Sequence, residues 1–152
     1  MTAHRLRSMD WLLRDLAQTV PEIRHIVVLS ADGLCLARYH ATREEGERIA
    51  AAASGINSLA RSLAAELPDD MPRLPQAPSA PGVTADEDVR VVVVELTGGL
   101  FYLMSAGDRS YLAVTASHEA DPGLVSNRMR DLVLRIGEHL SSAPRAPERA
   151  AP

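Results

Sequence analysis

Residues 42–67 read TREEGERIAAAASGINSLARSLAAEL, and they form the longest helix that the sequence predicts. Thr42 and Glu45 make a capping box, in which each side chain accepts a hydrogen bond from a backbone N–H at the helix start. Winding the segment at about 100° per residue gives one apolar stripe, which we expect a globular domain to bury. That stripe consists of Ile49, Ala53, Ile56, Ala60, Leu63 and Leu67.

The opposite side of this helix, the small-residue face, carries short side chains where a solvated helix normally has glutamate, lysine and glutamine. Glycine and serine lower helix propensity without a local gain, and short side chains let another backbone come close. We therefore expect a protein contact on this face, while a general enrichment in alanine is the simpler explanation. The predicted interface residues here are Ala51, Ser54, Gly55, Ser58, Ser62 and Ala65.

Length and charge restrict the class of protein. A chain of 152 residues ordinarily forms one domain with one core. The net charge of −4 and the lack of a basic stripe argue against nucleic-acid binding. The single cysteine, Cys35, is typical of a reducing cytoplasm. Arg14 and Asp15 interrupt the N-terminal apolar run, so neither a signal peptide nor membrane insertion is predicted.

The segment before the long helix predicts a short helix and a β-hairpin. Residues 8–19 have apolar side chains at helical spacing, with Ser8 as the expected N-cap. Residues 23–30 and 34–39 are rich in β-branched and apolar residues, and the Asp-Gly pair between them favours a tight turn.

The segment after the long helix predicts a loop, three strands, a helix and a tail. Residues 68–88 are rich in proline and are expected to form a long loop, and 141–152 a disordered tail. The unbroken valines 91–94 favour a strand covered on both faces. The three strands are expected at 89–96, 99–106 and 110–116, and the last helix from Pro122 to Leu140.

Signatures of catalysis, cofactor binding and metal binding are missing from the sequence. Gly98 and Gly99 lack the spacing and the Lys-Ser/Thr ending of a phosphate loop. The five histidines are scattered, without a pair at metal-ligand spacing. Ser30, His25 and Asp32 are the right residue types for a triad, but no nucleophile elbow surrounds the serine, and turn formation explains Ser30 and Asp32 better. We therefore predict no catalytic, cofactor-binding or metal-binding residues.

Four arginines are candidates for contact with a nucleotide on another protein. An arginine supplied in trans can stabilise the charge that develops on a GTPase's phosphates. Arg43, Arg48 and Arg61 lie on the long helix, and Arg109 lies in a turn. The alternative is that each is an ordinary solvated charge.

Three segments carry a resemblance to a known family: IRHIVVLSADGLCLARYH, ERIAAAASGINSLARSL and VVVVELTGGLFYLMSAGDRSYLAVTA. Together with the order of elements, they resemble the roadblock family of dynein light-chain-like proteins over about residues 8–140, and most of all its actinobacterial members. The resemblance implies one α/β domain of the α+β sandwich type, related to longin and profilin, within residues 1–140. Its five-stranded antiparallel sheet would carry the long helix on one face and the other two helices on the opposite face.

The family resemblance also implies a homodimer. Its members typically pair the third strand edge to edge with its mate, while the two long helices pack antiparallel. Carried over by position, this strand contributes Val89, Val91 and Val93, and the helix spans 43–66. The resemblance thus implies that the small-residue face contacts the second copy. The loop at 68–88 is longer than usual in the family and lies beside that strand.

The function that the resemblance implies is regulation or scaffolding without catalysis. The expected partner is a small Ras-like GTPase in a bacterial signalling system that includes a sensor kinase, and the effect would fall on the nucleotide cycle. Two alternatives remain open at this point. One is a PAS-like or profilin-like domain that senses a small ligand; the other is a general adaptor without a GTPase partner.

Overall fold

The computed structural model describes residues 2–67, 89–107 and 109–141, with side chains from 9 to 138 within these ranges. The predicted loop 68–88 and residues 142–152 of the predicted tail lie outside the described residues, whereas Ser141 belongs to the last helix. Three helices and five strands follow one another in the described ranges. In chain order they are α1 (Thr2–Thr19), β1 (Ile23–Ser30), β2 (Cys35–Tyr39), α2 (Arg43–Ala64), β3 (Val91–Leu96), β4 (Gly99–Ser105), β5 (Ser110–Ala116) and α3 (Pro122–Ser141).

The five strands form one antiparallel sheet in the order β2-β1-β5-β4-β3. The predicted hairpin is β1–β2, and Gly33 in its turn has a φ of 87°, which glycine adopts without strain. The predicted meander is β3–β4–β5. Because β1 pairs with β5, the hairpin and the meander join at the centre of the sheet, and β2 and β3 become its two edges.

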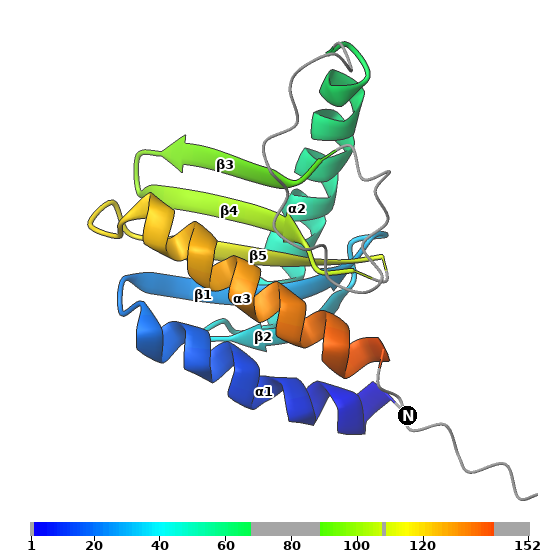
Figure 1. Cartoon of the computed structure of the whole chain (residues 1–152), viewed down its shortest axis with the longest axis vertical. Helices are drawn as coiled ribbons and strands as arrows, with labels where there is room; N and C mark the ends of the chain where they lie inside the picture. The colour runs from blue at the N-terminus through cyan, green and yellow to red at the C-terminus, as the bar shows by residue number, and fades with distance from the viewer. Residues whose placement is uncertain (1, 68–88, 108, 142–152) are drawn as a thin grey trace, which may run out of the picture.

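Helices cover both faces of the sheet, as the sequence predicted. α1 and α3 lie side by side on one face, and α2 crosses the other (Figure 1). A large apolar cluster under α1 and α3 includes Leu12, Ile26, Tyr102, Met129 and Ile136. A smaller cluster under α2 is formed by Val27, Leu29, Ala50, Ala53, Phe101, Leu103 and Ala113. The molecule is therefore a three-layer α+β sandwich, and the apolar core is larger on the α1–α3 face of the sheet than on the α2 face.

Two local predictions about helix α1 and strand β3 were wrong. α1 begins at Thr2 rather than at Ser8, so the serine is an interior helix residue and not the N-cap. β3 is not covered on both faces, because it is an edge strand with Val91 and Val93 exposed by 38% and 48%. A run of valines favours a strand, but the number of faces that are covered depends on the width of the helical layers.

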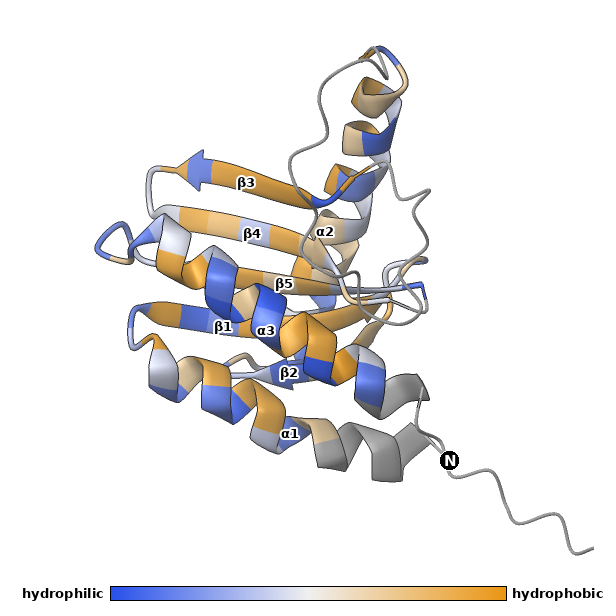
Figure 2. Cartoon of the chain, in the orientation of Figure 1, coloured by the Kyte–Doolittle hydropathy of each residue, from blue (hydrophilic) through white to orange (hydrophobic). Residues whose placement is uncertain are grey.

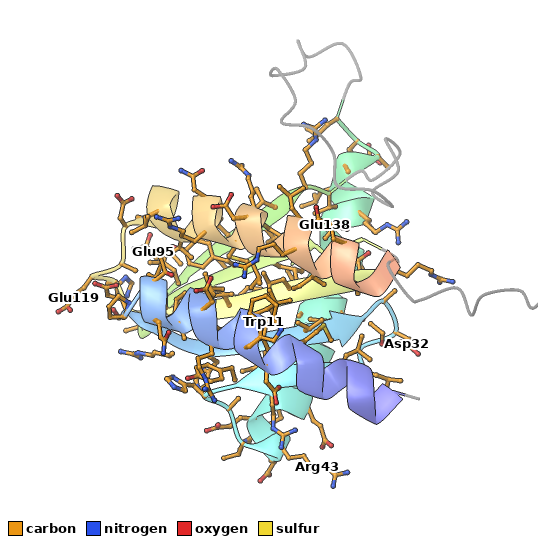
Figure 3. The ribbon with its side chains drawn as sticks, turned by 60° about the horizontal axis from the view of Figure 1, so that its bottom comes forward. Trp11, Asp32, Arg43, Glu95, Glu119 and Glu138 are labelled. Carbon is orange, nitrogen blue, oxygen red and sulfur yellow. The ribbon has the colours of Figure 1, made fainter. Side chains whose placement is uncertain are left out.

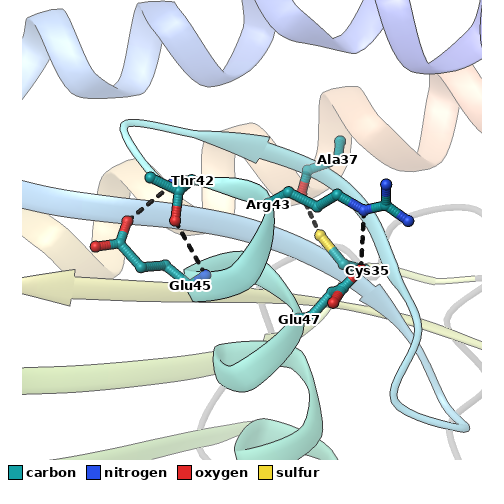
Figure 4. A network of polar contacts seen from close by, with 6 residues as sticks. All are labelled: Cys35, Ala37, Thr42, Arg43, Glu45 and Glu47. Atoms are coloured by element: carbon teal, nitrogen blue, oxygen red, sulfur yellow. Dashed lines mark hydrogen bonds and ion pairs between the residues drawn. The ribbon is translucent and has the colours of Figure 1, made fainter.

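The start of α2 has the predicted capping box. The Thr42 hydroxyl accepts from the Glu45 backbone N–H at 3.2 Å, and the Glu45 carboxylate accepts from the Thr42 backbone N–H at 2.8 Å (Figure 4). The hydrogen bond from the Thr42 backbone lowers the pKa of Glu45. In the same turn Arg43 forms an ion pair with Glu47 at 3.1 Å. The helix start is thus fixed by contacts within its own first turns.

Helix α2 contacts the sheet through a face that only partly overlaps the predicted stripe, because Ala53 is the one stripe residue that is fully buried. Its buried residues are Gly46, Ala50, Ala53 and Asn57, while Ile49 and Ile56 pack at the margin of the smaller cluster. Leu63 and Leu67 belong to the predicted buried stripe, but they are exposed by 68% and 69%. The reason is geometric, because the last turns of α2 extend beyond the edge strand β3, where no sheet lies beneath them (Figure 1).

Replacing Thr42 by alanine tests the capping box. The substitution removes the acceptor for the Glu45 N–H, so we expect the free energy of unfolding to fall by about 1 kcal/mol. Urea denaturation followed by circular dichroism at pH 7 measures it. Thr42→Ser keeps the hydroxyl and should remain close to the parent protein. Equal loss in both variants would show that the hydroxyl is not what stabilises the helix start.

Candidate interaction surface

An exposed apolar stripe follows the end of α2, and we call it the leucine stripe. It consists of Leu59 and Leu63 on the last turns and Leu67 directly after the helix, with exposures of 69%, 68% and 69%. Their spacing of four residues places them on one side of the helix. The stripe continues from Ile56, which packs against the smaller core cluster. The apolar side of α2 therefore begins in the core and ends in solvent.

The edge strand β3 lies beside this part of α2 and is also apolar. Figure 2 colours β3 as hydrophobic along most of its length. Val92 and Val94 pack toward the α2 side, whereas Val91, Val93 and Leu96 are exposed. Among the described strands β3 pairs only with β4, so the main-chain N–H and C=O groups along its outer edge have no strand partner. An exposed, regular edge of this kind is a template for pairing with another chain.

The small-residue face is exposed at five of its six predicted positions. Ala51, Gly55, Ser58, Ser62 and Ala65 lie on the surface. Ser54 differs, because it is half-buried and its hydroxyl donates a hydrogen bond to the Ala31 carbonyl oxygen at 3.2 Å. This hydrogen bond connects α2 to the β1–β2 turn. The Ser54 hydroxyl is therefore already used within the subunit and not for a partner.

The structure does not gather the candidate arginines into one site. Arg43 is held by Glu47 and points outward at the far end of α2 (Figure 3). Arg48 and Arg61 are exposed and make no ion pair with any residue that the structure describes; on a helical projection they flank the small-residue face on either side. Arg109 lies apart, in the β4–β5 turn, where it has a φ of 58° and its carbonyl oxygen accepts from the Ala31 N–H at 2.9 Å.

Polar contacts hold the turn between β3 and β4, and sequence reasoning did not identify them. His118 Nε2 lies 3.0 Å from the Thr97 carbonyl oxygen, and His118 Nδ1 lies 3.8 Å from the Glu95 carboxylate. Arg24 donates to the Gly98 carbonyl oxygen at 3.2 Å. Arg24 and His118 are distant in sequence from the β3–β4 turn. Only the tertiary structure therefore reveals that they hold this end of the edge strand in place.

The described residues do not assemble a catalytic or metal site. His25 contacts the Thr115 hydroxyl at 2.7 Å rather than Ser30, and the Ser30 hydroxyl donates to Asp32 within the turn, which lowers the pKa of Asp32. No group of three histidine, cysteine, aspartate or glutamate side chains in the described ranges could hold a metal ion. None of the described helices is long and apolar enough to cross a membrane.

Comparison with known proteins identifies the family. The family model for the Roadblock/LC7 domain matches residues 9–74. The crystal structure of a Roadblock/LC7 domain from Streptomyces avermitilis is 34% identical in sequence, with a TM-score of 0.73, and the match covers 88% of this chain and 98% of that one. The chain belongs to the Roadblock/LC7 family. The expected resemblance is thereby confirmed.

More distant structures share the fold of this Roadblock/LC7 chain. MglB from Myxococcus xanthus is 14% identical with a TM-score of 0.66, and the match covers 93% of this chain and 91% of MglB. The gliding protein MglB from Thermus thermophilus is 16% identical with a TM-score of 0.68, covering 88% of this chain and 91% of that one. At such identities the likeness concerns the fold alone. No curated protein sequence matches the chain.

The one cysteine of the Roadblock/LC7 chain provides a test of its local environment. Burial raises the pKa of Cys35, whose Sγ lies 3.6 Å from the Ala37 carbonyl oxygen. A raised pKa leaves less thiolate at neutral pH, and the thiolate is the nucleophile. We expect iodoacetamide to label Cys35 slowly at pH 7.5 and faster as the pH rises above 9. The exposed comparison is the double variant Cys35→Ser/Ser58→Cys, and equal rates at pH 7.5 would contradict this description.

Proposed function

We propose that this Roadblock/LC7 chain is a non-enzymatic, cytoplasmic homodimer that regulates a small Ras-like GTPase in a bacterial signalling system. The observation that most supports the proposed dimer is the leucine stripe beside the open edge of β3. Fully burying one leucine side chain contributes roughly 1.5–3 kcal/mol, so a contact that covers the stripe on both copies has a large driving force. The family resemblance supports the same pair of elements.

The proposed dimer has a two-fold axis beside β3. A two-fold contact uses the same patch on both copies, so β3 would pair antiparallel with β3 of the second copy. This pairing would satisfy the outer main-chain groups of β3 and bring the two α2 helices alongside each other. Val91 and Val93, together with the half-buried Val89, would lie along the joint sheet. The leucine stripe, rather than the small-residue face, is then the closest part of α2 to the partner.

The small-residue face remains available to the GTPase in this arrangement. Ala51, Gly55, Ser58, Ser62 and Ala65 give it no charged side chain, so a partner backbone can approach closely. Arg48 and Arg61 lie on either side of it, without ion pairs to described residues, and are placed to interact with acidic groups or phosphates on the partner. Arg43 is a weaker candidate because Glu47 already neutralises it.

The depression between α1 and α3 gives little support to the alternative of a small-ligand sensor. The depression between α1 and α3, lined by Leu12, Asp15, Leu132 and Arg135 among others, has a volume of about 70 Å³. Ligand pockets usually measure about 300–1,000 Å³. Arg135 also closes this surface, because it forms an ion pair with Asp15 at 2.8 Å and lies 5.1 Å above the centre of the Trp11 ring. This depression is too small for a typical metabolite.

The substitution Leu63→Glu tests the dimer contact. A carboxylate at the centre of the leucine stripe would have to be buried without a partner, so we expect a monomer by multi-angle light scattering where the parent protein is a dimer. Ser62→Glu is the matched control, because it adds the same charge one residue away on the small-residue face and should remain dimeric. A dimeric Leu63→Glu together with a monomeric Ser62→Glu would place the contact on the other face.

Binding to a GTPase is tested separately with the Ras-like GTPase encoded nearest to this chain. We expect binding by calorimetry to at least one of the GDP and GTP-analogue states, weakened about tenfold or more by the double variant Arg48→Glu/Arg61→Glu. Arg130→Glu, an exposed substitution on α3, should bind like the parent protein. No binding in either nucleotide state would refute the proposed partner while leaving the dimer untouched.

A further inference from the structure

The second edge of the sheet, β2, is open as well and lies at the opposite side from β3. β2 pairs with β1 on one side, and no described strand pairs with its other side. Alternate residues of Cys35–Tyr39 therefore present main-chain N–H and C=O groups outward along a strand of about 17 Å. An extended polypeptide is the partner that can satisfy a row of groups at this spacing.

A groove runs along this edge, bounded by α1, and we call it the β2 edge groove. Its volume is about 500 Å³, and it is lined by Asp10 and Arg14 of α1 and by the consecutive residues 36–41. Apolar lining comes from Leu36, Ala37 and Ala41, and Tyr39 stacks on His40 with ring centres 4.2 Å apart. A strand added to β2 would thus lie against a helix on one side and a strand edge on the other, as in known cases of β-strand addition.

The charges at the groove favour an acidic partner. Arg14 and Arg38 are exposed, and neither forms an ion pair with a residue that the structure describes. His40 adds a third basic group, and Asp10 is the only carboxylate among the lining residues. This basic composition occurs on a chain whose net charge is −4. Carboxylates on an incoming strand would meet two guanidinium groups that form no ion pair with a described residue.

The two arginines lie on opposite faces of the sheet. Arg14 belongs to α1, on the face that α1 and α3 cover. Arg38 packs toward α2, because a Cβ placed on the buried Gly46 would lie 3.0 Å from Arg38 Cδ and 3.6 Å from its Cβ. Successive side chains of a strand point to opposite faces. Two adjacent acidic residues in an added strand would therefore face Arg14 and Arg38 in turn.

We propose that the β2 edge groove binds an extended segment of another protein that adds to β2 as a sixth strand and pairs two adjacent carboxylates with Arg14 and Arg38. This interaction goes beyond the proposed dimer and GTPase contact, because it uses the opposite edge of the sheet. It does not require β3 to be free, so a dimer would carry two such grooves.

The test uses designed peptides and the full chain. The probe is a fluorescein-labelled octapeptide of alternating valine and threonine with two adjacent glutamates at its centre. Matched peptides carry two lysines or two glutamines there, and a fourth carries the glutamates with N-methyl groups on alternate residues. Fluorescence anisotropy measures the affinity, and ¹⁵N NMR up to millimolar peptide locates the site.

We expect the glutamate peptide to bind at least tenfold more tightly than the glutamine peptide, with NMR shifts in β2 and α1. The double variant Arg14→Glu/Arg38→Glu should prefer the lysine peptide, while Arg130→Glu should behave like the parent protein. Equal binding of the glutamate and lysine peptides, shifts elsewhere, or no shift at all would overturn the proposal. Equal binding of the N-methylated peptide would also overturn it, because it would show a simple anion site without strand addition.

Discussion

The close approach of α2 to the sheet is the contact on which the surface of this molecule depends. Gly46, Ala50 and Ala53 have almost no side chain to hold the helix away, so α2 packs tightly over β1, β2 and β5. In this helix of 22 residues the buried positions run from Gly46 to Asn57. Because the helix rises about 1.5 Å per residue, the turns after Asn57 continue past the edge of the sheet at β3. The leucine stripe is exposed as a direct consequence of where the packing occurs.

The two sheet edges have different characters, and this difference supports the different partners that we propose for them. β3 is regular in register against β4 over all six residues and carries exposed valines. β2 is shorter, its register with β1 shifts at Leu29, and Arg38 lies on it. Charges and irregularities of this kind protect an edge against unselective pairing. An apolar edge favours a stable contact with the same edge of a second copy. A basic, shorter edge instead favours a weaker contact with strands that carry the complementary charge.

Local sequence signals predicted the elements well but could not assign their exposure. The capping box at Thr42, the Asp-Gly turn and the start of α3 at Pro122 each depend on neighbouring residues, and each is found in the structure. The buried side of α2 was misjudged because helical periodicity gives the apolar side and not the length over which a sheet covers it. Ser54 was misjudged for a similar reason, since its acceptor, Ala31, lies 23 residues earlier in the chain. The contacts of His118 and Arg24 are likewise set by tertiary structure.

The leucine stripe is not explained by the stability of the isolated subunit. Leu59, Leu63 and Leu67 gain little from burial there, since about two-thirds of each side chain remains in contact with solvent. Helix propensity does not account for them either, because arginine, lysine and glutamine are about as favourable as leucine in a helix. Polar residues would therefore give the same helix with better solubility. Contiguous apolar surface of this kind, next to an unpaired strand, is typical of an interface, and it supports the assembly that we propose.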